Sequence, residues 1–216
     1  GVYTEIFMPL DGVSEKNQAR VLINLHGGSF TGGSRTTNQL ESIPIAALGR
    51  IKVVSVDYRM APEHQFPAAS QDVTQVYKAL LKDYKPENIG IFGYSAGGLL
   101  TAQSMAWFQS EDLPMPGAIG MFCGAARFWL DGVSANISAV LHGLDLKTLE
   151  IRETQYFKDI ENIADPLAFP GLAPTIMSKF PPSLFLTSTL DFSLSSVVST
   201  HSQLVKLGVE ADLHVW

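Results

Sequence analysis

Short runs of almost wholly apolar residues recur along the chain, each bounded by polar residues or glycine. In Val21–Leu25, for example, Asn24 is the only polar residue, and a His-Gly-Gly sequence follows the run directly. Apolar runs of this length without polar alternation are typical of β-strands covered on both faces. We therefore predict strands at 21–25, 53–56, 89–92, 118–123, 183–186 and 211–215.

Between the predicted strands, apolar residues recur at three- and four-residue spacing, which is the period of a helix with one buried face. The stretch 68–84 shows this spacing clearly, and 99–108 and 195–207 repeat it, with Gly208 just past the end of the last one. Strands and helices in alternation imply parallel strands joined by helical crossovers. The pattern predicts an α/β fold with a mostly parallel, doubly wound sheet.

The region 127–170 breaks this alternation. Its apolar residues have helical spacing, no strand-like run occurs, and the region is far longer than the roughly 2–6 residues of an ordinary connection in an α/β fold. We interpret it as a helical cap insertion over one end of the sheet, within a single domain that covers residues 1–216. The helical pattern rests on Val140, Leu141, Leu144, Leu146, Leu149 and Ile151.

The composition indicates a globular protein and argues against several kinds of partner. Of the 216 residues, 46% are hydrophobic and 17% are charged, unlike the composition of disordered chains. The net charge is −6 and no basic stripe occurs, so we expect no nucleic-acid partner. The apolar runs are much shorter than the roughly 20 residues of a membrane span. Residues 1–20 lack a signal-peptide pattern, which favours a cytoplasmic location.

Cys123 is the only cysteine of the chain, which excludes an internal disulfide bond and a zinc site built from cysteines. It ends the apolar run 118–123, so we interpret it as a buried thiol within a strand.

The segment Gly93-Tyr-Ser-Ala-Gly-Gly98 follows a predicted strand and opens a predicted helix. A serine on such a sharp strand-to-helix turn is held in a strained backbone conformation, with its hydroxyl exposed at the carboxyl end of the sheet. Ser95 is therefore the candidate nucleophile, and the N–H of Ala96 is a candidate donor to an oxyanion. The alternative is a glycine-rich helix start that carries a surface serine.

A second glycine motif, His26-Gly-Gly-Ser-Phe30, follows the strand 21–25 directly. Acyl transfer needs backbone N–H groups that hold the developing oxyanion, and glycines let the backbone turn toward the substrate oxygen. The N–H groups of Gly27, Gly28 and Ser29 are therefore candidate donors beside that of Ala96. The alternative is a simple turn.

The chain resembles the hormone-sensitive-lipase-type carboxylesterases of the α/β-hydrolase superfamily. The resemblance is carried by the two glycine motifs, by Asp165-Pro-Leu167 and above all by the run Asp57-Tyr-Arg-Met-Ala-Pro-Glu-His-Gln-Phe-Pro67. It implies a serine hydrolase that cleaves small carboxylic esters through an acyl-enzyme, with no metal or organic cofactor. We interpret the Asp57–Pro67 run as scaffold, with an ion pair between Asp57 and Arg59.

The resemblance also assigns the remaining groups of a catalytic triad. Asp191 lies where the family places its acid, whereas Asp165 falls in a structural turn. The family's base is a histidine on the loop after the last strand, so we expect it beyond Trp216, in a protein that extends past both ends of this chain. We assign other roles to the five histidines present, which are His26, His64, His142, His201 and His214.

Two substitutions depart from the family pattern: Ser29 replaces the third glycine of the first motif, and Tyr94 replaces the usual acidic residue before the nucleophile. Phe30, Phe128 and Trp129 are candidates for the apolar wall of a substrate pocket, with core packing as the alternative. Two other functions stay open, a binding module that turns nothing over and an amidase or acyltransferase. The strand 211–215 would be a sheet edge, which makes a homodimer plausible.

Overall fold

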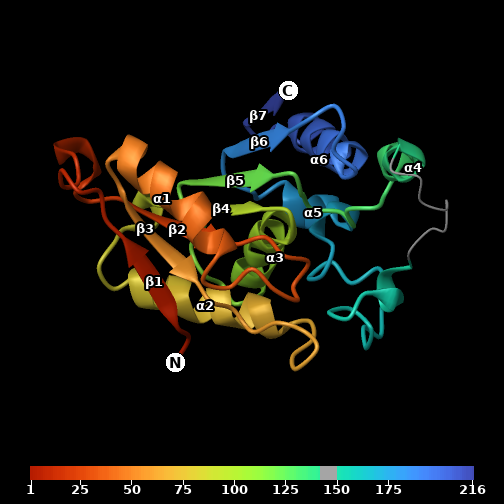
Figure 1. The fold of residues 1–216 in the computed structure, drawn as a ribbon, viewed down its shortest axis with the longest axis horizontal. Helices are drawn as coiled ribbons and strands as arrows, with labels where there is room; N and C mark the ends of the chain where they lie inside the picture. The colour runs from red at the N-terminus through yellow and green to blue at the C-terminus, as the bar shows by residue number, and fades with distance from the viewer. Residues whose placement is uncertain (142–149) are drawn as a thin grey trace.

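One sheet of seven strands forms the centre of the molecule in a computed structural model that describes residues 1–141 and 150–216. The strand order is β1-β3-β2-β4-β5-β6-β7, and only β1 runs antiparallel to its neighbour. Figure 1 shows the sheet crossing the molecule from β1 to β7. The strands are β1 (Thr4–Phe7), β2 (Val21–Leu25), β3 (Lys52–Val56), β4 (Ile89–Tyr94), β5 (Ala118–Phe122), β6 (Ser183–Thr187) and β7 (Ala211–Val215).

Helices cover both faces of this sheet, so the predicted α/β class is confirmed. Ile23, Ile91 and Phe185 belong to the larger core, which also contains apolar residues of α2, α3 and α6. Val53 and Phe92 belong to a smaller core on the opposite face, against Ala46 of α1. The helices are α1 (Thr37–Gly49), α2 (Ala68–Leu80), α3 (Ala96–Ser110), α4 (Val133–Leu141), α5 (Pro174–Met177) and α6 (Leu194–Lys206).

All six predicted strands and the three predicted helices occur, with ends that differ by a few residues. Four short 3-10 turns complete the regular structure of residues 1–141 and 150–216, at Glu15–Asn17, Pro86–Asn88, Ile151–Glu153 and Pro170–Leu172. Within the described ranges, every helix falls short of the length and hydrophobicity that crossing a membrane requires.

The sequence pattern missed β1 and α1. β1 is a four-residue edge strand whose Ile6 is exposed, so it lacks the continuous apolar run of the inner strands. In α1, Leu40 and Leu48 are exposed whereas Asn38 and Ser42 are buried, which reverses the usual helical pattern. The helix also contains a proline, which removes one internal hydrogen bond.

The region 127–170 carries α4 and the 3-10 turn at Ile151–Glu153, and its described part contains no strand. α4 packs against α6 and stands apart from the sheet in Figure 1. His142, Leu144, Leu146 and Leu149 lie outside the described residues, so the helical pattern that they suggested there stays a prediction, as do the boundaries of the cap.

Candidate active site

Ser95 occupies the turn between β4 and α3, at the carboxyl end of the sheet. Its φ is +55° and its ψ is −117°, a strained conformation for a residue with a side chain. The N–H of Ser95 donates to the carbonyl oxygen of Phe122 at 2.7 Å, which fixes the turn to the neighbouring strand. A Cβ on Gly97 would lie 1.7 Å from the carbonyl oxygen of Leu25, so only glycine lets α3 start this close to β2.

The loop after β2 runs beside Ser95 and has three successive residues with positive φ. These are Gly28 (+125°), Ser29 (+55°) and Phe30 (+59°). The carbonyl oxygen of Gly28 accepts hydrogen bonds from the N–H groups of Thr31 and Gly32, at 2.9 and 3.1 Å. These bonds close the loop into a tight turn at the carboxyl end of β2.

The candidate oxyanion donors differ in what they already bind. The N–H of Gly27 donates to Glu41 Oε1 at 3.1 Å, so this amide is engaged within the protein. The N–H groups of Gly28, Ser29 and Ala96 have no protein acceptor among the described residues. Three of the four predicted donors therefore remain free to bind a ligand oxygen, and Gly27 does not.

A small pocket lies at Ser95. Its volume is about 20 Å³, which is room for about one water molecule. Its lining contains three of the predicted site residues together with two aromatic residues, and consists of Ser29, Ser95, Ala96, Trp129 and Phe192.

The three aromatic residues predicted to form a substrate wall lie in different places. Trp129 lines the pocket at Ser95. Phe30 is completely buried and stacks on Tyr156 with a distance of 4.2 Å between ring centroids, so it is a core residue. Phe128 is also buried, with a distance of 4.6 Å between the centroids of its ring and that of Trp129.

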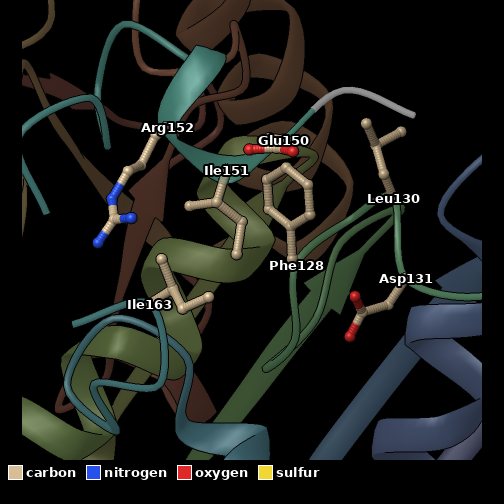
Figure 2. Close-up of a pocket in the computed structure, with 7 residues that line it drawn as sticks. All are labelled: Phe128, Leu130, Asp131, Glu150, Ile151, Arg152 and Ile163. Atoms are coloured by element: carbon tan, nitrogen blue, oxygen red, sulfur yellow. The ribbon is translucent and has the colours of Figure 1, made fainter. Parts of the chain in front are cut away.

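Phe128 lines a larger cavity in the cap region, of about 370 Å³ (Figure 2). The side chains of Phe128, Ile151 and Ile163 point toward one another there, whereas Arg152 points away from them. None of the residues that line this cavity also lines the pocket at Ser95, so we do not place the chemistry there. The lining consists of Phe128, Leu130, Asp131, Glu150, Ile151, Arg152 and Ile163.

Asp191 follows β6 at the same end of the sheet as Ser95, and the next residue, Phe192, lines the pocket at Ser95. One carboxylate oxygen of Asp191 accepts hydrogen bonds from the N–H and the hydroxyl of Ser193, both at 2.9 Å. The other accepts from the hydroxyl of Thr187 at 2.7 Å. The carboxylate is therefore held in place by neighbours on both sides. The competing carboxylate, Asp165, instead accepts the N–H of Leu167 within a turn.

Cys123 lies just past the end of β5 rather than within it, which corrects the prediction that the strand includes it. It is half-buried and has a φ of +51°. Burial and the neighbouring Asp191 carboxylate raise the pKa of the Cys123 thiol to about 12, so the thiol stays protonated and is a poor nucleophile. Burial also raises the pKa of Tyr94, the residue before Ser95.

Among the described residues, no histidine side chain hydrogen-bonds to Ser95 or Asp191. His26 is buried and stacks on Tyr58, and its Nδ1 lies 2.8 Å from the carbonyl oxygen of Gly27. Burial lowers the pKa of His26. His201 lies 3.3 Å from the carbonyl oxygen of Ala211, and His214 lies 3.2 Å from Asp212. His142 lies outside the described residues.

Two groups near the site escaped the sequence analysis. Phe192 has no pattern of its own, and Glu41 lies on α1, which the pattern missed.

The predicted ion pair between Asp57 and Arg59 is wrong. Arg59 instead pairs with Asp72 of α2 at 2.9 Å, and Asp57 lies 3.7 Å from Arg35, so the fold supplies each residue with a different partner.

The chain is similar to several known proteins in sequence and fold. A family model described as alpha/beta hydrolase fold matches residues 22–216. An esterase of Acinetobacter venetianus is 29% identical over 173 residues, which cover 76% of this chain and 57% of the relative. A kynurenine formamidase of Meyerozyma guilliermondii is 33% identical over 82 residues, or 38% of this chain and 32% of the relative. The chain thus spans little more than half of the first relative and a third of the second.

Two solved structures superpose on the whole chain. The esterase E25 does so with a TM-score of 0.86 and 30% identity, and the chain covers 65% of it. An esterase from the bacterial hormone-sensitive lipase family does so with a TM-score of 0.83 and 27% identity, and the chain covers 74% of it. With the matching family model and the confirmed sheet, these likenesses show that the chain belongs to the α/β-hydrolase superfamily, among the hormone-sensitive-lipase-type esterases.

Proposed function

We propose that this chain carries the nucleophile, the oxyanion hole and the acid of a serine carboxylesterase that cleaves small carboxylic esters. The observation that carries the proposal is the pocket at Ser95, where the strained serine meets the free N–H groups of Ser29 and Ala96. Acyl transfer needs a nucleophile and oxyanion donors at one point. A surface serine without a catalytic role would need neither a strained backbone nor free N–H groups beside it. The esterases to which the chain is similar support the substrate class.

In the first half of the proposed reaction, Ser95 Oγ bonds to the ester carbonyl carbon while a general base takes the hydroxyl proton. The negative oxygen of the tetrahedral intermediate accepts hydrogen bonds from the N–H groups of Gly28, Ser29 and Ala96. The bond to the alcohol then breaks, and the alcohol leaves with the proton from the base. Trp129 and Phe192 offer apolar surface to the ester.

In the second half, water replaces the alcohol. The base takes a proton from the water as its oxygen bonds to the acyl carbon, and the same N–H groups hold the second intermediate. The bond to Ser95 breaks, Ser95 regains its proton, and the carboxylic acid leaves. The sum is one ester and one water converted to one acid and one alcohol.

The proposed base is a histidine in a segment after Trp216. The N–H of Trp216 donates to the carbonyl oxygen of Thr187, and its carbonyl oxygen accepts from the N–H of Thr189. A residue that follows Trp216 would therefore start beside Thr189, two residues before Asp191 in the chain, and we propose that a short loop from there brings an imidazole to the carboxylate. Asp191 would hold its tautomer and stabilise the imidazolium that forms.

The test uses the full-length protein with p-nitrophenyl acetate. We expect Ser95→Ala to lower kcat/KM by about 10³-fold or more and Asp191→Asn by about 10²-fold or more. Asp165→Asn is the matched control for the acid, because Asp165 makes a turn, and we expect it to change kcat/KM by less than about fivefold. Turnover that survives Ser95→Ala would refute the esterase proposal. A larger loss in Asp165→Asn than in Asp191→Asn would refute the assignment of the acid.

An amidase is the second candidate, favoured by the likeness to a kynurenine formamidase, whose name denotes hydrolysis of an amide. The same residues would perform this reaction, with an amine as the leaving group. Matched ester and anilide substrates that share an acetyl or formyl group separate the two. Faster turnover of the anilide would favour the amidase, and no Ser95-dependent turnover of either would favour a binding module.

A further inference from the structure

Glu41 is a partly buried carboxylate that faces the loop beside Ser95 from α1. Oε1 accepts the N–H of Gly27 at 3.1 Å, and Oε2 is shielded from solvent without a hydrogen-bond partner among the described residues. Burying a carboxylate is costly unless hydrogen bonds compensate. The proposed mechanism gives this side chain no role.

We propose that Glu41 is a positioning residue of the oxyanion hole, which directs the N–H groups of Gly28 and Ser29 toward Ser95 by holding the N–H of Gly27. This inference rests on the proposed function, because it concerns the same site.

The peptide unit between His26 and Gly27 is held at both of its polar ends. Its carbonyl oxygen, on His26, accepts the hydroxyl of Tyr58 at 2.6 Å, and its N–H, on Gly27, donates to Glu41. Because a trans peptide is planar with its N–H and C=O on opposite sides, these two bonds fix the plane of the unit. Among the described residues, Glu41 is the only protein acceptor for that N–H.

Among the described residues, the next two peptide units are held only at their carbonyl oxygens. The oxygen of Gly27 lies 2.8 Å from His26 Nδ1, and the oxygen of Gly28 accepts from the N–H groups of Thr31 and Gly32. In each unit the N–H must point the opposite way from its carbonyl, so the N–H groups of Gly28 and Ser29 are left free of the loop's own hydrogen bonds. Their direction depends on the first unit, which precedes them.

Removing the acceptor on Glu41 would leave the N–H of Gly27 buried and unpaired, which costs free energy and favours rotation of the first unit. Glycine at 27 and 28 offers little resistance to such a rotation. A shift of about 1 Å in a positioning group can lower a rate by about 10²-fold. The consequence falls on the oxyanion, which exists only in the intermediate, rather than on binding of the ester.

The test compares Glu41→Gln, Glu41→Leu and Glu41→Asp in the full-length protein, with p-nitrophenyl acetate and a boronic acid that forms a tetrahedral adduct with serine. Gln keeps an acceptor oxygen at the same reach. Leu removes the acceptor, and Asp keeps the carboxyl group but draws it back by one methylene. Gln39→Leu is the control for a polar-to-apolar change on the same helix, because the side chain of Gln39 makes no hydrogen bond to the loop among the described residues.

We expect Glu41→Leu and Glu41→Asp to lower kcat by about 10-fold or more, with KM within about twofold. The affinity for the boronic acid should fall by a similar factor. Glu41→Gln should stay within about threefold of the wild type in kcat. A kcat for Glu41→Asp equal to that of wild type, or for Glu41→Gln as low as that for Glu41→Asp, would overturn the proposal even if Glu41→Leu does not fold. Ser95→Ala in the same assay distinguishes failure of this proposal from failure of the proposed function. If Ser95→Ala abolishes turnover, the esterase proposal stands even when the Glu41 variants contradict the positioning role.

Discussion

Left-handed backbone conformations gather at the residues around Ser95. Ser29, Ser95 and Cys123 have φ values of 55°, 55° and 51°. Each of these residues has a side chain, for which a left-handed conformation costs about 1–2 kcal/mol relative to glycine. Arg50 and Asp112, at the C-terminal ends of α1 and α3, also have positive φ, but the strain around Ser95 lies where sites commonly keep strained backbone for function. Ser29 is the most accessible of the three to a test, because it is exposed and stands where the resembling family has glycine.

We expect Ser29→Gly to have a free energy of unfolding about 0.5–1 kcal/mol higher than that of Ser29→Ala. Both variants remove the hydroxyl and both keep the backbone N–H, but only glycine relieves the strain of the positive φ. The gain is partly offset because glycine also makes the unfolded chain more flexible. Urea denaturation of both variants measures the difference. Equal midpoints and slopes would show that Ser29 is not strained in the folded protein.

At the scale of elements, the inner strands were predictable because burial on both faces leaves a continuous apolar run, as in Val21–Leu25. α1 was not predictable because its inward face is polar. Asn24 of β2 donates to the hydroxyl of Ser42 at 2.8 Å, so a hydrogen bond between helix and strand adds to the small apolar contact made by Ala46. A hydrophobic pattern cannot reveal a helix that is anchored in this way.

The same limit applied to the site. Ser95 and the glycine loop could be predicted because their chemistry is local to a motif. Glu41 and Phe192 meet the site only through the fold, since they come from α1 and from the loop after β6. Phe30 stands in a motif yet packs in the core, which sequence alone could not distinguish from a place in the pocket.

β7 is an edge of the sheet, and we expect it to pair with a second copy of the protein. The backbone of Trp216 hydrogen-bonds to Thr187 and Thr189 beside β6, so the alternation along a strand directs the N–H of Val215 outward. Val215 itself is 44% exposed. Unpaired edge strands are natural templates for pairing between chains.

Val215→Pro should therefore shift the full-length protein from dimer to monomer in sedimentation experiments at micromolar concentration, because proline has no N–H to donate. Val215→Thr is the control, since it keeps the N–H and the shape of the side chain, and it should remain dimeric. A wild-type protein that sediments as a monomer up to about 100 μM would rule out this interface, whichever state the variants adopt.

For the molecule as a whole, two buried groups beside the oxyanion loop give folding stability opposite dependences on pH. Burial raises the pKa of Glu41 from its ordinary value of 4.5 to about 7, so the folded state holds a proton that the unfolded chain releases. Stability from this group is fully present below about pH 4.5 and is lost as the pH rises to about 7. Burial lowers the pKa of His26, so its effect is the reverse, with stability lost as the pH falls below 6.5.

Glu41→Gln separates the two effects, because glutamine does not titrate and His26 is unchanged. Tyr58 and Tyr94, which face Glu41, have raised pKa values and stay protonated throughout this range. We expect the free energy of unfolding of Glu41→Gln, relative to wild type, to increase steadily from pH 5 to pH 7 and then to level off. Urea denaturation at half-unit steps measures this, with Glu63→Gln at an exposed position as a control that should parallel wild type. A difference between Glu41→Gln and wild type that stays constant from pH 5 to pH 8 would mean that Glu41 is ionised in the folded protein throughout, and that its burial is compensated by hydrogen bonds to its charged form.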